Sequence, residues 1–116
     1  MKTFKSLTST LVATAVFVLS SVAAQAQSTW DAIQDRGTLR IGVTQAPPWF
    51  TKDLASGEWT GGLGITLGEQ MAAALEVELE TVEVTWGTSI AALQSDKIDL
   101  MYFLSPTASR ARAIDF

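Results

Sequence analysis

The pattern of apolar and polar positions along this chain predicts strands and helices that alternate. Strand patterns occupy residues 38–43, 77–84 and 98–104, and helical patterns occupy residues 30–37, 65–75 and 89–94. The run from Ile98 to Leu104 has the length and hydrophobicity of a strand that is buried on both faces, as parallel strands are. Because crossovers between parallel strands are right-handed, we expect the sheet order 2-1-3. The predicted fold class is therefore α/β, with a parallel sheet.

Turn and capping residues set the ends of these elements. Residues 28–29 are suited to cap the first helix, and Gly37 is suited to end it. The pairs Ser56-Gly57 and Gly61-Gly62 predict a hairpin or extended turn over residues 53–62. A new helix is expected to begin within the turn at 105–109, so that Arg110 lies one turn inside it.

Two further patterns concern packing. Leu67, Met71 and Leu75 recur every four residues and predict a stripe that belongs to the core rather than to a cofactor site. In the second strand the apolar parity changes between Leu79 and Val82, which predicts a bulge or short break.

Four glutamates lie in or beside the second strand: Glu76, Glu78, Glu80 and Glu83. Paired carboxylates are found in acid–base and metal sites, but like charges on one strand face repel each other, and the chain has no histidine to join a metal site. We therefore interpret them as the solvated face of an edge strand. The sequence indicates neither a metal nor a cofactor.

The first 26 residues have the pattern of a secretory signal peptide. Lys2 and Lys5 precede an apolar segment at 11–19, and Ala24-Gln25-Ala26 fits a cleavage site for signal peptidase. The apolar segment is too short to span a membrane, and no cysteine follows it that would carry a lipid. We therefore expect cleavage after Ala26 and a periplasmic protein without a lipid anchor.

Composition narrows the classes of partner. Cleavage removes two of the eight basic residues, which leaves six against twelve acidic ones and a net charge of −6. Such a balance argues against nucleic acid or an anionic membrane surface as a partner. It does not exclude a small anion that is held by one arginine. The absence of cysteine excludes disulfide bonds.

A turn of small and hydroxyl residues follows the third strand pattern: Ser105, Pro106, Thr107, Ala108, Ser109 and Arg110. Hydroxyl groups and unpaired N–H groups at a helix start favour an anion. Arg110 lies one turn into the expected helix, where the dipole disfavours a cation by roughly 0.3–1 kcal/mol, so a bound anion would compensate. From spacing alone two interpretations stand, a carboxylate site or an ordinary cap followed by a solvated arginine.

The loop after the first strand presents aromatic rings. Pro47 and Pro48 fix its backbone, and Trp49 and Phe50 follow. Either ring is suited to stack on a ligand, and the alternative is that one or both fill the core beside the sheet. In the order 2-1-3 this loop and the turn at 105–110 meet at a switch point beyond the carboxyl ends of the strands, where α/β folds bind ligands.

Four segments then form a familiar order: Arg36–Val43, Pro47–Trp49, Trp86–Asp99, and Thr107–Arg110 before Ile114-Asp115-Phe116. Over residues 29–116 the chain resembles the family 3 extracytoplasmic solute-binding proteins of polar amino-acid ABC transporters. The resemblance implies a periplasmic-binding-protein-like (type II) lobe. Residues 27–116 would then form the first part of the N-terminal lobe, after a signal peptide at 1–26.

The resemblance also implies site residues. Arg110 corresponds to the fork that binds the α-carboxylate of the ligand, Ser105 to a hydroxyl residue of the site, and Thr107 to the threonine whose backbone N–H joins it. Trp49 or Phe50 would pack on the ligand. Phe103 departs from the pattern, because the family usually has a small residue there, and this implies a narrower or shifted pocket.

The implied function is periplasmic binding of an amino acid, or a similar small carboxylate, for delivery to the membrane permease of an ABC importer. We expect no catalysis, no cofactor, and a monomer at full length. Proteins of this family are longer than this chain. Without later strands the run 98–104 would expose an unpaired apolar edge, so we expect residues 27–116 alone to bind poorly and to be poorly soluble. The alternatives are an enzyme on the same fold, similar to cyclohexadienyl dehydratase, and the sensory module of a membrane receptor. With neither histidine nor cysteine, the chain offers no clear nucleophile or general base.

Overall fold

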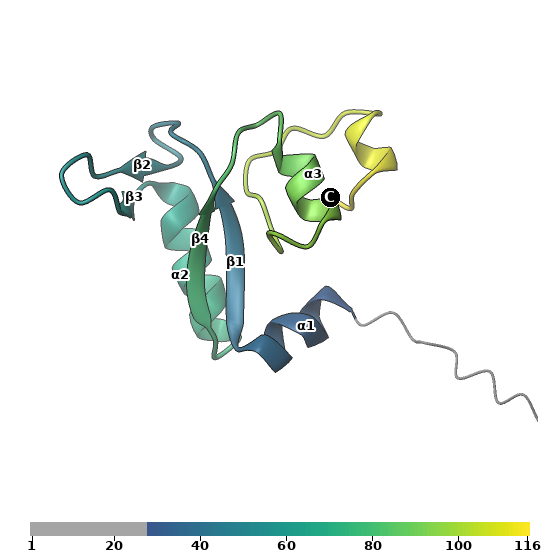
Figure 1. Ribbon diagram of the computed structural model, residues 1–116, viewed down its shortest axis with the longest axis horizontal. Helices are drawn as coiled ribbons and strands as arrows, with labels where there is room; N and C mark the ends of the chain where they lie inside the picture. The colour runs from purple at the N-terminus through teal and green to yellow at the C-terminus, as the bar shows by residue number, and fades with distance from the viewer. Residues whose placement is uncertain (1–27) are drawn as a thin grey trace, which may run out of the picture.

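The computed structural model describes residues 28–116, and Figure 1 shows its elements in space. In chain order they are α1 (Thr29–Arg36), β1 (Thr38–Val43), β2 (Thr51–Lys52), β3 (Trp59–Gly61), α2 (Leu63–Ala74), β4 (Glu78–Glu83), α3 (Ser89–Gln94) and the 3₁₀ turn η1 (Arg110–Arg112). The predicted signal peptide, residues 1–26, lies outside the described residues. Within 28–116 no helix has the length and apolar character needed to cross a membrane.

β1 and β4 form a parallel pair in continuous register over six residue pairs. Successive residues of β1 form backbone hydrogen bonds at opposite edges of the strand. The Val43 carbonyl accepts from the Val84 N–H at 2.9 Å on the β4 side, whereas the Gly42 N–H donates to the Leu100 carbonyl at 2.8 Å. Leu100 therefore lies beside β1 on the side away from β4, as the predicted order 2-1-3 requires, and the fold is α/β as expected.

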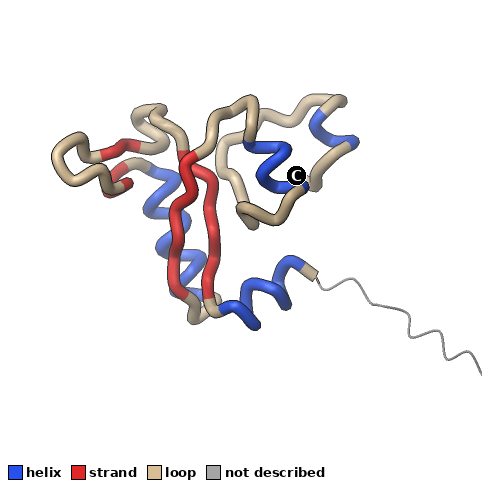
Figure 2. The backbone as a smooth tube through the Cα atoms, in the orientation of Figure 1, coloured by secondary structure: helices blue, strands red, loops and turns tan. Residues whose placement is uncertain are grey.

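The predicted third strand, Ile98–Leu104, is nevertheless not a strand. One bridge, between Ile41 and Leu100, joins it to β1, and the segment is drawn as loop in Figure 2. Beyond Leu100 the path is broken because Phe103 has a left-handed backbone, with φ of 62°, which an extended strand does not contain. The buried side chains of the segment recur every three residues rather than every second one, so the apolar run reflects one-sided packing.

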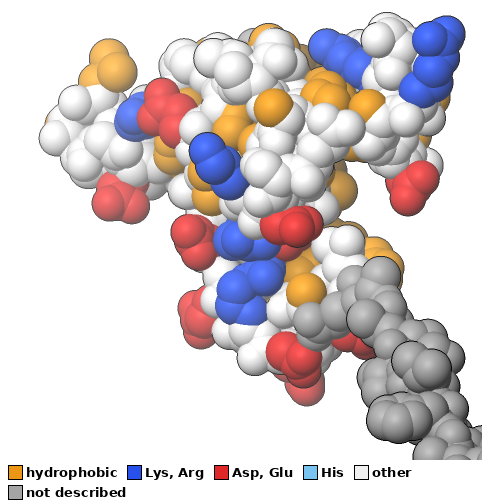
Figure 3. All heavy atoms as spheres, turned by 45° about the vertical axis from the view of Figure 1, so that its right-hand side comes forward, with side chains coloured by type: hydrophobic (Ala, Val, Ile, Leu, Met, Phe, Trp, Pro, Cys, Tyr) orange, Lys and Arg blue, Asp and Glu red, His pale blue; other side chains and the backbone are white. Residues whose placement is uncertain are grey.

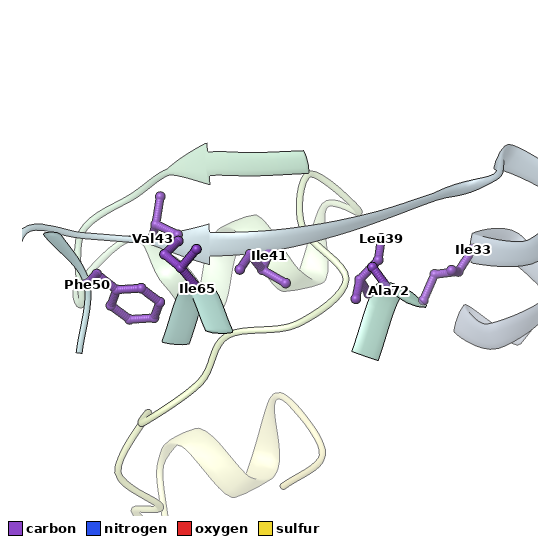
Figure 4. Close-up of a cluster of buried hydrophobic side chains, with 7 residues drawn as sticks. All are labelled: Ile33, Leu39, Ile41, Val43, Phe50, Ile65 and Ala72. Atoms are coloured by element: carbon purple, nitrogen blue, oxygen red, sulfur yellow. The ribbon is translucent and has the colours of Figure 1, made fainter. Parts of the chain in front are cut away.

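One face of β1 packs against α2 and the end of α1. The buried cluster, shown in Figure 4, contains Ile33, Leu39, Ile41, Val43, Phe50, Ile65 and Ala72. α2 approaches closely because of Gly68, where an added Cβ would lie 2.7 Å from the Ile41 Cδ1 atom. The predicted stripe of Leu67, Met71 and Leu75 is half-buried, and Met71 and Leu75 pack against this cluster, as expected for core residues. The deepest face of α2 is therefore made of smaller residues than the pattern predicted.

A second buried cluster lies under α3 and contains Ala92, Ile98, Met101 and Leu104. Val82 packs against this cluster, whereas Leu79 packs against the cluster under α2. The parity change between these two residues therefore marks a change of packing partner. The predicted bulge is wrong, because the register between β1 and β4 is uninterrupted.

The glutamates at 76, 78, 80 and 83 are exposed, and β4 pairs with β1 alone among the described strands, which confirms a solvated edge strand. The Glu83 carboxylate lies 2.7 Å from the Lys52 Nζ. No group of acidic, histidine or cysteine side chains within residues 28–116 is arranged to hold a metal ion.

Several predicted ends are confirmed. The Ser28 hydroxyl accepts from the Asp31 N–H at 3.1 Å and caps α1. Gly37 ends this helix with φ of 70°, a conformation that glycine adopts without strain. β2 and β3 form the expected antiparallel hairpin, and α3 has the predicted bounds.

Candidate functional site

The loop after β1 and the segment after Leu100 meet at the carboxyl end of β1. The ring centroids of Trp49 and Phe103 lie 4.6 Å apart with an interplanar angle of 30°. Phe103 precedes Ser105, the first residue of the predicted binding turn, by two positions. The structure thus brings the aromatic loop against the segment that leads into the predicted turn, at the end of the sheet that the sheet order indicates.

The backbone around Trp49 is held by the start of α2. The Leu63 N–H donates to the Pro48 carbonyl at 3.1 Å, and the Gly64 N–H donates to the Trp49 carbonyl at 2.8 Å. Gly62, the residue before Leu63, has to be glycine, because a Cβ there would overlap the Trp49 carbonyl. The loop therefore presents Trp49 from a fixed backbone.

Phe50 is not available to a ligand. Its side chain is fully buried, and its ring packs so close to Gly64 that an added Cβ there would overlap it. Trp49, in contrast, is 40% exposed. Of the two rings named from the sequence, Phe50 belongs to the core, and Trp49 alone is retained as a candidate contact.

The turn at 105–110 is closed by its own hydrogen bonds. The Arg110 N–H donates to the Thr107 Oγ1 at 3.2 Å, and the Ala111 N–H donates to the Thr107 carbonyl at 2.9 Å. The Arg110 Nη1 donates to the Ser105 carbonyl at 2.9 Å. Instead of the expected longer helix, a single 3₁₀ turn follows, and Arg110 is its first residue rather than lying one turn inside. Thr107 thus closes the turn through both its hydroxyl and its carbonyl oxygen.

Arg110 differs from the arginines of β1 and α1 in its partners. Among residues 28–116 no carboxylate lies within ion-pair distance of Arg110, whereas Arg36 and Arg40 both pair with Asp99. Basic side chains project from the corner of the molecule that η1 forms (Figure 3), and the basic residues of η1 are Arg110 and Arg112. Arg110 therefore keeps guanidinium donors for an external anion.

Asp99 ties three segments together away from this site. Its carboxylate lies 2.6 Å from the Arg36 Nη2 and 2.8 Å from the Arg40 Nη2, and it also accepts from the Arg40 N–H at 2.8 Å. Burial raises the pKa of Asp99, but the hydrogen bonds from Arg40 and the charges of both arginines outweigh burial and hold this pKa below its ordinary value. Arg36 and Arg40 thus serve the fold and are not candidates for ligand binding.

A cavity beside the segment 98–104 does not coincide with the predicted site. It has a volume of about 500 Å³ and is lined by the segment 98–104, the end of α3 and residues 113–116. Ser105, Thr107, Arg110 and Trp49 are absent from its lining, and Phe103 is present. Phe103 thus borders both regions. The sequence marked this residue only as a departure from a pattern, and no sequence signal predicted its contact with Trp49.

The chain is similar to known proteins in sequence and in fold. The sequence profile of bacterial extracellular solute-binding proteins, family 3, matches residues 39–116. No curated protein matches the chain. Among solved structures, an ancestral cationic amino acid solute-binding protein is similar at 37% identity with a TM-score of 0.70, over 77% of this chain and 39% of that protein.

The chain is also similar to two further solved structures. The arginine-bound form of domain 1 of the arginine-binding protein from T. maritima is similar at 31% identity with a TM-score of 0.63, over 71% of this chain and 65% of that one. An ancestral cyclohexadienyl dehydratase is similar at 35% identity with a TM-score of 0.67, over 75% of this chain and 36% of that one. The chain thus spans less than two fifths of both ancestral proteins.

Proposed function

The chain belongs to the bacterial extracellular solute-binding proteins of family 3, and from this membership we propose that it binds a free amino acid through the α-carboxylate. Arg110 is the proposed carboxylate partner. The observation that carries the proposal is that Arg110 lacks an acidic partner among the described residues, in a turn that follows a loop contact at the carboxyl end of β1.

The chemistry of Arg110 fits this role. A guanidinium group has five N–H donors in a plane, and the Ser105 carbonyl takes one at 2.9 Å. The others suit the two oxygens of a carboxylate, which arginine binds in a bidentate manner. The Arg110 side chain is half-buried, so an ion pair with a ligand would be only partly screened by water.

The neighbouring residues complete the proposed site. Ser105 and Thr107 are exposed in the same turn as Arg110, and we assign their hydroxyl or backbone N–H groups to the same carboxylate. Trp49 supplies an exposed ring on a fixed loop. We further propose that the protein works in the periplasm as a monomer, delivers its ligand to the permease of an ABC importer, and uses no cofactor.

We propose binding without turnover. Most of the similar structures are named as binding proteins, although one is an ancestral dehydratase. The chain contains no histidine or cysteine, the side chains that most often act as general base or nucleophile near neutral pH. Incubation of the full-length gene product with prephenate and arogenate tests this point, because product formation would assign it to the enzymes instead.

Calorimetry with the full-length gene product tests the carboxylate site. The ligands are a panel of amino acids and, for each one that binds, its α-carboxamide. The variants are Arg110→Ala and Arg112→Ala, the latter being a matched control two positions along the same turn. Arg110→Ala should weaken binding by about 10- to 150-fold, which corresponds to the loss of a charged hydrogen bond of roughly 1.5–3 kcal/mol.

The carboxamide separates a direct contact from a structural effect. If Arg110 binds the carboxylate, its removal should hardly change the already weak affinity for the carboxamide. Equal losses for both ligands would instead show that Arg110 only supports the turn. Failure of the wild-type protein to bind any amino acid would reject the proposed function as a whole.

A further inference from the structure

Residues 28–116 contain two methionines, Met71 and Met101, and their surroundings differ. Met71 lies on α2, is half-buried, and packs at the margin of the cluster between α2 and β1. Met101 is only 7% exposed, and its Sδ atom would lie 2.6 Å from a Cβ added at Gly42. Met101 is therefore enclosed by the fold, and Met71 is the more accessible of the two.

A second cavity borders the Met71 side chain. It has a volume of about 160 Å³, and its lining comes from α1, β1, α2 and the pair Asp99-Leu100. Space for one water molecule takes only about 10–15 Å³, so this cavity admits water and molecules of similar size, such as hydrogen peroxide. A small oxidant would thus lie against Met71 without any displacement of the core.

The Met71 sulfur also has a hydroxyl donor beside it. The Tyr102 hydroxyl donates to the Met71 Sδ atom at 3.4 Å, and within residues 28–116 this sulfur is the one acceptor found for it. Thioether sulfur is a weak acceptor. Burial raises the pKa of Tyr102, so the hydroxyl keeps its proton and remains a donor. The pair therefore places a good donor against a poor acceptor.

We propose that Met71 is an oxidation site and that the Tyr102 hydroxyl binds the oxygen of the resulting sulfoxide. The oxidant is hydrogen peroxide. A lone pair of the sulfur attacks one peroxide oxygen, so that an S–O bond forms while the O–O bond breaks. The departing hydroxide takes the proton of the transferred oxygen and leaves as water. The sulfur loses two electrons, and the peroxide gains them.

The Tyr102 hydroxyl distinguishes this site from an ordinary accessible methionine. Oxidation turns an apolar side chain into a polar one and disturbs its packing. A sulfoxide oxygen that is partly buried needs a donor, and a donor that is already in place offsets part of this cost. Met71 belongs to α2 and Tyr102 to the segment that leads into the turn at 105–110, so oxidation acts on the contact between these two parts of the fold. The site uses none of the groups proposed for amino-acid binding.

Peptide mapping of the full-length gene product tests the site itself. The protein is treated with hydrogen peroxide, and mass spectrometry follows the peptides that contain Met71 and Met101. Met71 should be oxidised at least about 10-fold faster, because a buried side chain such as Met101 becomes accessible only by local opening. Equal rates, or a faster reaction at Met101, would overturn the assignment.

Thermal unfolding of treated and untreated protein tests the role of the hydroxyl. Tyr102→Phe removes only the hydroxyl, Met71→Leu removes the sulfur at similar volume, and Met101→Leu is the matched control. Oxidation should lower the Tm of the wild type. In Tyr102→Phe the decrease should be larger by about 1–6 °C, because the sulfoxide lacks its donor. Met71→Leu should remove the decrease, and Met101→Leu should retain it.

Two results would overturn the pairing of Met71 with Tyr102. An equal decrease in the wild type and in Tyr102→Phe would show that the hydroxyl does not bind the sulfoxide. An unchanged decrease in Met71→Leu would place the effect of peroxide at another residue. The peptide comparison uses the unaltered sequence, so it decides the site even if one of the variants does not fold.

Discussion

Replacement of Asp99 by asparagine should remove the main electrostatic link between α1, β1 and the segment that leads to the site. Asp99→Asn keeps the size of the side chain but takes away its charge and part of its hydrogen-bonding capacity. The change leaves Arg36 and Arg40 beside each other without their shared partner. It therefore probes whether this ion pair, rather than apolar packing alone, holds the segment 98–104 against β1.

The expected loss of stability in Asp99→Asn follows from the burial of Asp99 and from its hydrogen bonds. The Asp99 carboxylate accepts four hydrogen bonds from the two arginines, at 2.6–3.3 Å, and its side chain is only 5% exposed. Removal of one partner from a buried ion pair costs roughly 3–5 kcal/mol. The side chains of Arg36 and Arg40 keep 33% and 19% exposure and turn partly to water, so we expect the lower end, about 3 kcal/mol.

The same carboxylate gives the stability a pH dependence of known sign. Burial raises the pKa of Asp99, yet the arginines lower it more, so its pKa in the folded protein lies below the ordinary value. The unfolded chain therefore binds more protons in acid. The contribution is complete above the ordinary pKa of about 4 and is lost as the pH falls through the folded value. Asp99→Asn should show a shallower acid loss than the wild type.

Urea unfolding of the full-length gene product, followed by tryptophan fluorescence at neutral and acid pH, measures both effects. Asp115→Asn is the matched control, because Asp115 is exposed and has no ion pair among the described residues. A loss below about 1 kcal/mol at neutral pH would refute the reasoning. So would an acid dependence that is the same in wild type and Asp99→Asn.

Two other predictions concern packing and the edge beyond Leu100. Gly64→Ala places a Cβ within the Phe50 ring and should destabilise the protein by about 1–3 kcal/mol in the same urea assay, whereas Gly87→Ala, whose Cβ would meet only the Thr85 hydroxyl at 3.8 Å, should be close to neutral. Residues 27–116 expressed alone should self-associate, because the N–H groups of residues 101–104 form no hydrogen bond within 28–116 and border the large cavity. Light scattering that shows a monodisperse monomer of residues 27–116, together with micromolar amino-acid binding, would contradict the predicted self-association.

The predicted behaviour of residues 27–116 alone can be compared with that of a separate domain from a similar protein. One of the similar structures is domain 1 of the T. maritima arginine-binding protein in its arginine-bound form. This chain covers only 65% of that domain. The expectation for residues 27–116 therefore rests on the missing third and on the unpaired backbone at 101–104, rather than on the absence of a second lobe.

Local sequence signals predicted the ends of helices and strands correctly where a residue type has one strong conformational preference. Ser28 and Gly37 cap α1 as predicted, and the bounds of β1 match the predicted strand. The choice between Trp49 and Phe50 was not predictable, because both are large aromatic residues after the same two prolines. It is decided by Gly64, distant in sequence, which leaves space for the ring of Phe50 alone.

The wrong predictions share a physical cause. Hydrophobicity reports that a residue is buried but not which neighbour buries it. In β4 the side chains of Leu79 and Val82 pack against different helices, so a change of partner looked like a bulge. Likewise α2 buries Gly68 more deeply than Met71, because a close helix–strand contact excludes large side chains.

The third strand prediction fails at Phe103, where the segment 98–104 meets the loop after β1. A regular strand through Phe103 would turn successive side chains to opposite faces and would pair its backbone groups with a neighbour. The left-handed Phe103 gives up that pairing and brings its ring against Trp49. A sequence that favours a strand but folds as a bend carries a local conflict, and such conflicts are expected at functional sites. The strand prediction therefore fails because a ring contact between distant residues, which the hydrophobic pattern does not encode, takes the place of sheet pairing at Phe103.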